Sequence, residues 1–239
     1  MPGIESALIA LVIIAFASAL QASIGFGLAL VAAPLLALVD RAYVPGPILC
    51  AGLFLGAIMT VRERNEIDLG GVGWAALGRF LGIVPAGFAL HWASQAAFDR
   101  MFASLVLAAV AMSVLHGNLK PKRGVVFGAG LISGFMGTIT SIGGPPLALA
   151  YQSASGPRLR ATLAALFALG SVASIATLAV IGRFGEAEAV RGLLLVPGVL
   201  VGVLVSGPLL PYLDQGATRP MVLGLSTLSA LAVLLRAAS

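Results

Sequence analysis

The chain has 239 residues, of which 59% are apolar and only 10% are charged, whereas about 25% of residues are charged in an ordinary soluble domain. This composition argues against a soluble enzyme, and the mean hydropathy of +1.07 indicates a polytopic membrane protein. The net charge of +5 comes from single basic residues at the ends of apolar runs, which is typical of membrane anchoring and argues against nucleic-acid binding.

Ten apolar segments, separated by charged residues or by Pro and Gly, follow one another along the chain. The first half holds residues 4–20, 26–39, 46–61, 71–92 and 98–115, and the second half holds residues 124–139, 144–153, 161–181, 190–211 and 220–235. No basic stretch precedes the first segment, so we expect a retained membrane helix and not a signal peptide. Cys50 is the only cysteine, which excludes disulfides within the chain.

The second segment of each half is too short to cross a membrane. At 1.5 Å per residue, residues 26–39 span about 21 Å and residues 144–153 about 15 Å, against about 30 Å of hydrocarbon. We therefore expect broken or re-entrant helices that begin inside the membrane. Paired segments of this kind, interrupted by Gly or Pro, point to the binding site of a transporter.

The two halves repeat each other in sequence. The stretch from Ser23 to Leu30 matches that from Ser141 to Leu149 with one inserted residue, and residues 100–115 match residues 219–235 more weakly; chance apolar similarity is the alternative for the weaker match. Because each half has five segments, an odd number, the second must enter the membrane from the opposite side. The predicted fold is an all-α polytopic membrane protein made of two inverted repeats, residues 1–118 and 119–239.

Basic residues are unevenly divided between the two sides of the membrane. Five belong to one side: Arg41, Arg100, Arg183, Arg191 and Arg236. Eight belong to the other: Arg62, Arg64, Lys120, Lys122, Arg123, Arg158, Arg160 and Arg219. The positive-inside rule predicts that the richer side is cytoplasmic and that both termini face outward.

Glycine-rich turns precede both short segments, and we interpret them as an anion site. A helix that begins in the membrane interior directs unpaired N–H groups and the positive end of its dipole at a ligand, and nearby hydroxyls and amides add donors. The predicted substrate-binding residues of this kind are Gln21, Ser23, Gly25, Gly27, Thr138, Thr140, Ser141, Gly143, Gly144 and Gln152. Small residues also serve tight helix packing, and we assign four Gly-x-x-x-Gly pairs to that role: Gly52/Gly56, Gly78/Gly82, Gly130/Gly134 and Gly198/Gly202.

Two ionisable residues of segment 71–92, Arg79 and His91, are the intramembrane candidates for a functional role. Arg79 is a predicted substrate counter-ion, with snorkelling of its side chain to the membrane surface as the alternative. His91, beside Trp92, is typical of an interfacial anchor, with a role in proton transfer as the alternative. No acidic residue lies deep in a segment, and we predict neither a metal site nor a cofactor.

The turns Ser23-Ile24-Gly25-Phe26-Gly27 and Thr140-Ser141-Ile142-Gly143-Gly144-Pro145-Pro146 resemble those of the sulfite exporter TauE/SafE family of bacterial membrane transporters. The resemblance covers essentially the whole chain. The sequence departs from the family's more typical pattern, Gly-x-Gly-Gly-Gly-aromatic, in both halves: it has Gly25-Phe26-Gly27 in the first and a double proline in the second. It implies export of a small sulfur-containing anion, such as sulfite or sulfoacetate, across the cytoplasmic membrane. The motif positions that it implies for substrate contact are Ser23, Gly25, Gly27, Thr140, Ser141, Gly143 and Gly144.

We therefore predict a secondary transporter whose partners are a small anion and the lipid bilayer; homo-oligomer formation stays open. The alternatives are an anion channel or facilitator, uptake of small carboxylates, and a membrane scaffold. An intramembrane enzyme is disfavoured because the sequence lacks the usual motifs: the Ser133-Gly134 pair, for example, follows Leu131 where a rhomboid-type site has glycine.

Overall fold

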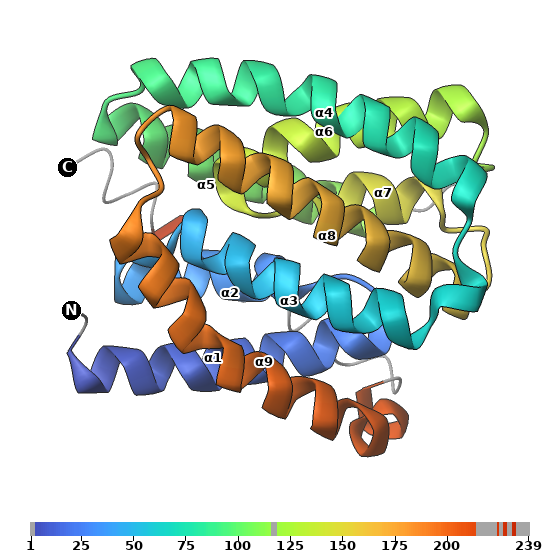
Figure 1. The fold of residues 1–239 in the computed structure, drawn as a ribbon, viewed down its shortest axis with the longest axis horizontal. Coiled ribbons are helices and arrows are strands. Elements are labelled where there is room, and N and C mark those ends of the chain that lie inside the picture. Colours follow the sequence, from blue (N-terminus) through green and yellow to red (C-terminus); the bar gives the residue numbers. More distant parts are fainter. Residues whose placement is uncertain (1–2, 116–118, 214–223, 225–226, 229–230, 233–239) are drawn as a thin grey trace.

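The computed structural model describes residues 3–115, 119–213, 224, 227–228 and 231–232. Within the continuous stretches of this described part, the regular elements are nine α-helices and two short 3-10 helices (Figure 1). In chain order they are α1 Ile4–Ile24, α2 Leu28–Val39, η1 Arg41–Tyr43, α3 Gly46–Arg62, η2 Arg64–Glu66, α4 Leu69–Trp92, α5 Gln95–Val114, α6 Arg123–Thr140, α7 Gly144–Ala150, α8 Gly156–Val180 and α9 Glu186–Leu213. The predicted all-α fold is confirmed.

Each of the first nine predicted segments overlaps one of these α-helices. The tenth, residues 220–235, lies outside the described residues except for 224, 227–228 and 231–232. Six described helices are long and apolar enough to cross a membrane: α1, α4, α5, α6, α8 and the part of α9 from Glu186 to Gly207. The helix α3 has 17 residues and falls just below this length.

The two short predicted segments are short helices. The helix α2 has 12 residues and α7 has seven, so they rise about 18 Å and about 11 Å. The helix α7 is shorter than the predicted segment 144–153, because the chain turns after Ala150: the Ala154 N–H donates to the carbonyl of Tyr151 at 2.9 Å, and the Tyr151 hydroxyl contacts Asp68 at 3.3 Å.

The turns that precede α2 and α7 use left-handed backbone. The helix α1 ends at Gly25, with φ 99°, and Gly27 has φ 131°; glycine reaches these angles without a steric penalty. The helix α6 ends at Ser141, whose φ of 66° is uncommon for a residue with a side chain. Two hydrogen bonds hold this turn: the Ser141 hydroxyl donates to the carbonyl of Pro45, 96 positions away in the chain, at 2.9 Å, and Ile142 N–H donates to Thr140 Oγ1 at 3.0 Å.

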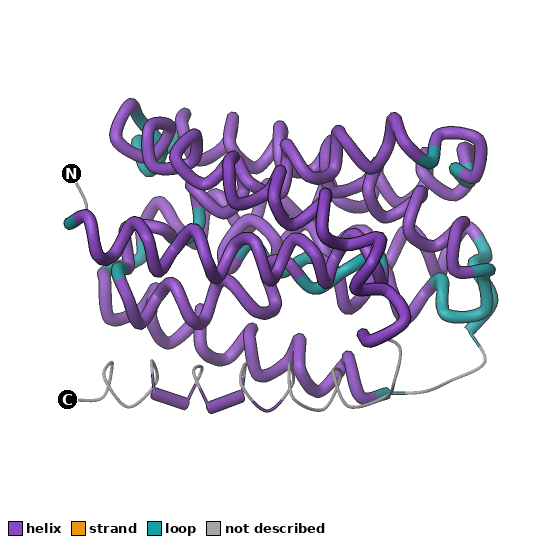
Figure 2. Tube along the Cα trace, turned by 90° about the horizontal axis from the view of Figure 1, so that it is seen from below, coloured by secondary structure: helices purple, strands orange, loops and turns teal. Residues whose placement is uncertain are grey.

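The long helices run along one direction and their connections lie at two ends of the bundle (Figures 1 and 2). In Figure 1, α4 and α6 lie along one edge, α1 and α9 along the opposite edge, and α3 and α8 between them. The most extensive helix contacts are those of α4 with α6, α1 with α9, and α3 with α8. Each of these three contacts joins a helix of the first half to a helix of the second half.

Seven of the eight glycines in the Gly-x-x-x-Gly pairs bring helix backbones into contact, as predicted; Gly52 does not, because a Cβ atom there would meet only Ser171 Oγ, at 3.5 Å. A Cβ atom on Gly78 or Gly82 of α4 would overlap the carbonyl oxygens of Phe127 and Leu131 on α6. In return, Gly130 and Gly134 of α6 lie against the carbonyls of Ala75 and Arg79 on α4. The same kind of contact places Gly198 and Gly202 of α9 against the carbonyls of Leu11 and Ala15 on α1, and Gly56 of α3 against that of Ala164 on α8. The small residues allow this close approach, which stabilises helix pairs in membranes.

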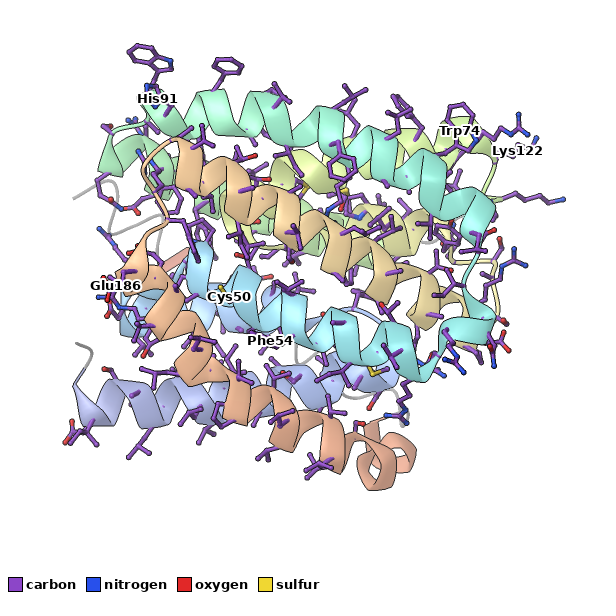
Figure 3. All side chains as sticks on the ribbon, in the orientation of Figure 1. Cys50, Phe54, Trp74, His91, Lys122 and Glu186 are labelled. Atoms are coloured by element: carbon purple, nitrogen blue, oxygen red, sulfur yellow. The ribbon has the colours of Figure 1, made fainter. Side chains whose placement is uncertain are left out.

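Charged side chains collect at the two ends of the bundle. Lys122 and Trp74 mark one end in Figure 3, and His91 and Glu186 mark the other. At the Lys122 end, Arg158 pairs with Asp68 at 3.1 Å and Arg160 with Glu63 at 3.1 Å. At the other end, Arg41 pairs with Asp99 at 3.0 Å. Both His91 and Trp92 are exposed at the end of α4, as expected for interfacial residues. Arg219 and Arg236 lie outside the described residues.

Candidate functional site

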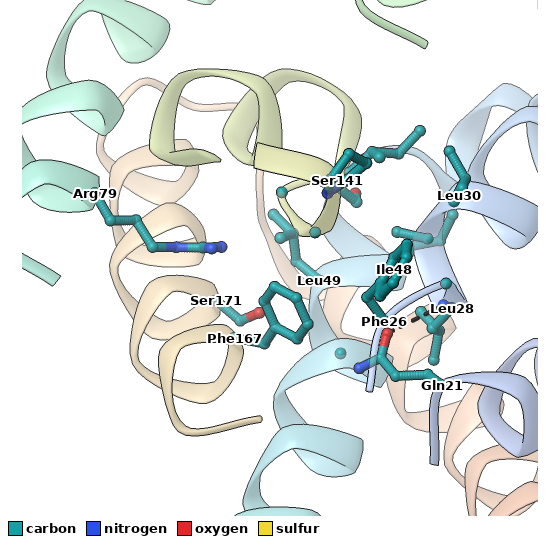
Figure 4. A pocket seen from close by; sticks show the side chains of 17 residues that line it. Gln21, Phe26, Leu28, Leu30, Ile48, Leu49, Arg79, Ser141, Phe167 and Ser171 are labelled. Carbon is teal, nitrogen blue, oxygen red and sulfur yellow. Dashed lines mark hydrogen bonds between the residues drawn. The ribbon is translucent and has the colours of Figure 1, made fainter. Parts of the chain in front are cut away.

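A small cavity lies where the two short helices begin. Its volume is about 30 Å³, and its wall includes the starts of α2 and α7 together with residues of α3, α4 and α8 (Figure 4). Gly27 and Leu28 reach it from the first turn, and the stretch from Ser141 to Pro145 reaches it from the second. The two turns that repeat each other in sequence thus meet at one cavity.

Six of the eleven predicted site residues line this cavity: Gln21, Gly27, Arg79, Ser141, Gly143 and Gly144. The other five, which are Ser23, Gly25, Thr138, Thr140 and Gln152, are outside its wall. Gln152 lies beyond α7 in the turn toward α8. Gly25 lies behind the first turn, where an added Cβ would come within 2.9 Å of Arg160 Cγ.

The three hydroxyls outside the cavity bond to their own helices. Ser23 Oγ donates to the carbonyl of Ala19 at 2.8 Å. Thr138 Oγ1 bonds to the carbonyl of Gly134 and to Ser174 Oγ, each at 2.8 Å. Thr140 Oγ1 donates to the carbonyl of Met136 at 2.7 Å. Ser and Thr commonly bond back to the preceding helical turn in this way, and these hydroxyls therefore shape the turns and do not face the cavity.

Arg79 points into the protein and does not snorkel. Its side chain extends from α4 toward the cavity (Figure 4), and the residue is only 3% exposed. Nη1 donates to Ser133 Oγ at 2.7 Å, and this hydroxyl donates in turn to the carbonyl of Gly143 at 2.7 Å. Two successive hydrogen bonds therefore connect the Arg79 guanidinium, through Ser133 of α6, to the turn that precedes α7.

Three glycines make room for the guanidinium group. A Cβ atom on Gly170 of α8 would overlap Arg79 Nε and Cζ. A Cβ on Gly137 would lie 3.3 Å from Nη2, and one on Gly143 would lie 3.0 Å from Nη1. The Phe167 ring covers another side, with its centroid 5.8 Å from Cζ, within the range of a cation–π interaction. The position of this cation is therefore set by four elements of the fold.

Arg79 has no carboxylate partner among the described residues. The ion pairs found there join Arg41 to Asp99, Arg158 to Asp68, Arg160 to Glu63 and Arg191 to Glu188. Arg79 Nε is buried with no hydrogen-bond partner in this part of the chain. A buried guanidinium is costly unless an opposite charge accompanies it, so the arrangement is suited to binding an anion.

Gln21 fixes the start of α2. Its Oε1 accepts a hydrogen bond from Leu28 N–H at 3.0 Å, which satisfies one of the backbone donors that a helix start leaves unpaired. The N–H donors of the same side chain are on Nε2, and Gln21 lines the cavity. Gln21 thus orients the turn and also contributes to the wall.

Sequence reasoning missed Ser133, Phe167 and Ser171. In the sequence Ser133 stands out only as part of an incomplete enzyme motif, yet it lies four residues before Gly137 and seven before Thr140, a spacing that places all three on one helix face. Ser171 follows Gly170 and lines the cavity. No sequence signal distinguishes these residues from ordinary packing residues, because their role depends on where Arg79 lies.

The family model described as sulfite exporter TauE/SafE matches residues 10–233 of the chain. This range includes both turns and every residue of the cavity wall. No curated protein and no solved structure matches the chain.

Proposed function

The chain belongs to the sulfite exporter TauE/SafE family of membrane transporters of sulfur anions, and from this premise we propose that it exports a small sulfur oxyanion or organosulfur anion, such as sulfite or sulfoacetate. The observation that carries the proposal is the buried Arg79, which faces a cavity between two helix starts and has no carboxylate partner in the described part of the chain.

The cavity supplies the interactions that a small anion needs. Arg79 has five N–H donors, of which one is directed at Ser133. The helix α2 begins at the cavity wall, so the positive end of its dipole adds to the favourable potential. Ser141, Ser171 and Gln21 contribute neutral polar groups. A volume of about 30 Å³ favours a ligand of few atoms over a sugar or a peptide.

We further propose that residues 1–118 and 119–239 are inverted repeats. The helix contacts support this, because the pairing of α1 with α9 becomes the pairing of α6 with α4 when the halves are exchanged, and the pairing of α3 with α8 exchanges with itself. The short helices α2 and α7 occupy corresponding positions, each following the first helix of its half. In many secondary transporters, repeats of this kind alternate access to a site at their interface.

We place the protein in the bacterial cytoplasmic membrane, with the Lys122 end of the bundle toward the cytoplasm and both termini outside. The support is the excess of basic residues in the loops at that end. Homo-oligomer formation stays a prediction.

Proteoliposomes reconstituted with the full chain test the proposal. Sulfite efflux should depend on the protein, and the variant Arg79→Gln should reduce it more than tenfold. The variant Arg64→Gln, at an exposed residue in the loop between α3 and α4, is the matched control and should behave as wild type. Equal flux in the two variants would refute a role for Arg79.

Counterflow separates a transporter from a channel or facilitator. In vesicles preloaded with unlabelled sulfite, a carrier accumulates labelled sulfite transiently, whereas an open pore does not. Acetate and other short carboxylates, tested in the same vesicles, check the alternative of carboxylate uptake.

A further inference from the structure

We propose that the cavity selects anions by charge: it accepts singly charged anions and rejects doubly charged ones. Of the two substrates named above, sulfite is then carried as hydrogen sulfite, and sulfoacetate, a dianion at neutral pH, is excluded. This inference rests on the proposed function, because it specifies the charge of the ligand at the same cavity. It concerns a property that the family match leaves open, since sulfite exists in both charge states near neutral pH.

The first argument is the fixed charge of the cavity wall. Among the described residues that line it, Arg79 is the only one with an ionisable side chain. A bound monoanion therefore brings the charge of the site to zero. A bound dianion leaves one negative charge in a buried environment, where an uncompensated charge is costly.

The second argument concerns two other arginines, Arg158 and Arg160. Arg160 lies behind Gly25, but its Nε bonds to Glu63 at 3.1 Å, and Arg158 pairs with Asp68 at 3.1 Å. Both are ion pairs at the Lys122 end of the bundle and outside the cavity wall. Each pair has no net charge, so neither supplies the second positive charge that a dianion requires.

The third argument is the mixture of donors and acceptors. Arg79 can only donate hydrogen bonds, whereas the Ser171 hydroxyl and the Gln21 amide oxygen also accept them. A monoanion that carries an O–H group finds both kinds of partner, while a dianion needs donors alone. The rings of Phe26 and Phe167 form apolar parts of the wall (Figure 4), against which the uncharged part of a sulfonate can rest.

Binding to the purified full chain tests the inference with two probes of fixed charge. Methanesulfonate is a monoanion and sulfate is a dianion throughout the neutral pH range. We expect methanesulfonate to bind at least tenfold more tightly than sulfate. Equal affinity, or tighter binding of sulfate, would overturn the inference.

A pH series with sulfite gives an independent measurement on the unmodified protein. The apparent affinity for total sulfite should rise as the pH falls and hydrogen sulfite replaces the dianion, while the affinity for methanesulfonate stays constant. Affinity that instead rises with pH would overturn charge selection while leaving anion transport intact. If none of the three anions bound, the proposed function would fail, and the inference with it.

A second positive charge in the wall should weaken the preference for the monoanion. The variant Ser171→Lys is expected to narrow the ratio of methanesulfonate to sulfate affinity at least fivefold. The control variant Asn65→Lys adds the same charge at an exposed loop residue and should leave the ratio unchanged. An unchanged ratio in folded Ser171→Lys protein would contradict the charge argument.

Discussion

The guanidinium group of Arg79 lies directly against the backbone of Gly170, at a point where even a methyl group on Gly170 would overlap Nε. A positive charge on α4 thus reaches the cavity because α8 has no side chain in its path. Arg79 and Gly170 are 91 positions apart in the sequence, yet the position of the Arg79 side chain depends on Gly170.

The variant Gly170→Ala tests this relationship. The added methyl group should displace Arg79 and reduce sulfite transport more than tenfold, while the protein still inserts into the membrane. Transport in proteoliposomes and the elution profile on size exclusion measure the two effects. Gly128→Ala is the control, because an added Cβ at Gly128 meets nothing within 4 Å. Normal transport in Gly170→Ala would show that the position of Arg79 is unimportant.

The variant Ser133→Ala removes the hydroxyl between Arg79 and the carbonyl of Gly143. A hydrogen bond to a charged group contributes about 1.5 to 3 kcal/mol, so we expect anion affinity to fall at least tenfold. Ser23→Ala is the control, since that hydroxyl bonds within α1. A larger loss of anion affinity in Ser23→Ala than in Ser133→Ala would show that Ser23 contacts the anion. This would contradict its placement outside the cavity wall.

The variant Gly143→Ala places a Cβ atom 2.7 Å from Ser133 Oγ and 3.0 Å from Arg79 Nη1. We expect it to abolish transport. Ser141→Ala should be milder, because it removes a single neutral hydrogen bond to Pro45, worth about 0.5 to 1.5 kcal/mol. Initial rates of efflux rank the two variants, and the reverse order would contradict the proposed geometry of this turn.

Export of a monoanion should respond to membrane potential. A potential of 100 mV, negative inside, favours expulsion of one negative charge by about 2.3 kcal/mol, which sustains a gradient of about fifty-fold at 1.4 kcal/mol per factor of ten. Proteoliposomes with a clamped potassium diffusion potential measure the effect. Flux that ignores the sign of the potential would exclude net charge movement, and a strict requirement for a proton or sodium gradient would indicate a coupling site elsewhere.

Several features of the fold follow from the sequence alone. A bilayer requires each spanning backbone to satisfy its own hydrogen bonds, so the length of an apolar run indicates directly whether a helix can cross. The apolar runs therefore predict the nine described α-helices, of which α2 and α7 are too short to cross. The sequence also places glycine-rich turns before both, because a chain that reverses inside the membrane needs residues that adopt left-handed backbone, as Gly25 and Gly27 do.

Only the tertiary structure decided which side chains face the cavity. The local sequence of Arg79 permits both snorkelling and burial, and the choice depends on space left by Gly137, Gly143 and Gly170, which belong to three other elements. The hydroxyl of Thr140 can point to a ligand or to its own helix, and it bonds to its helix. The sequence shows which of these side chains can bind an anion. Whether each side chain points to the cavity depends on contacts between residues that are distant in the chain.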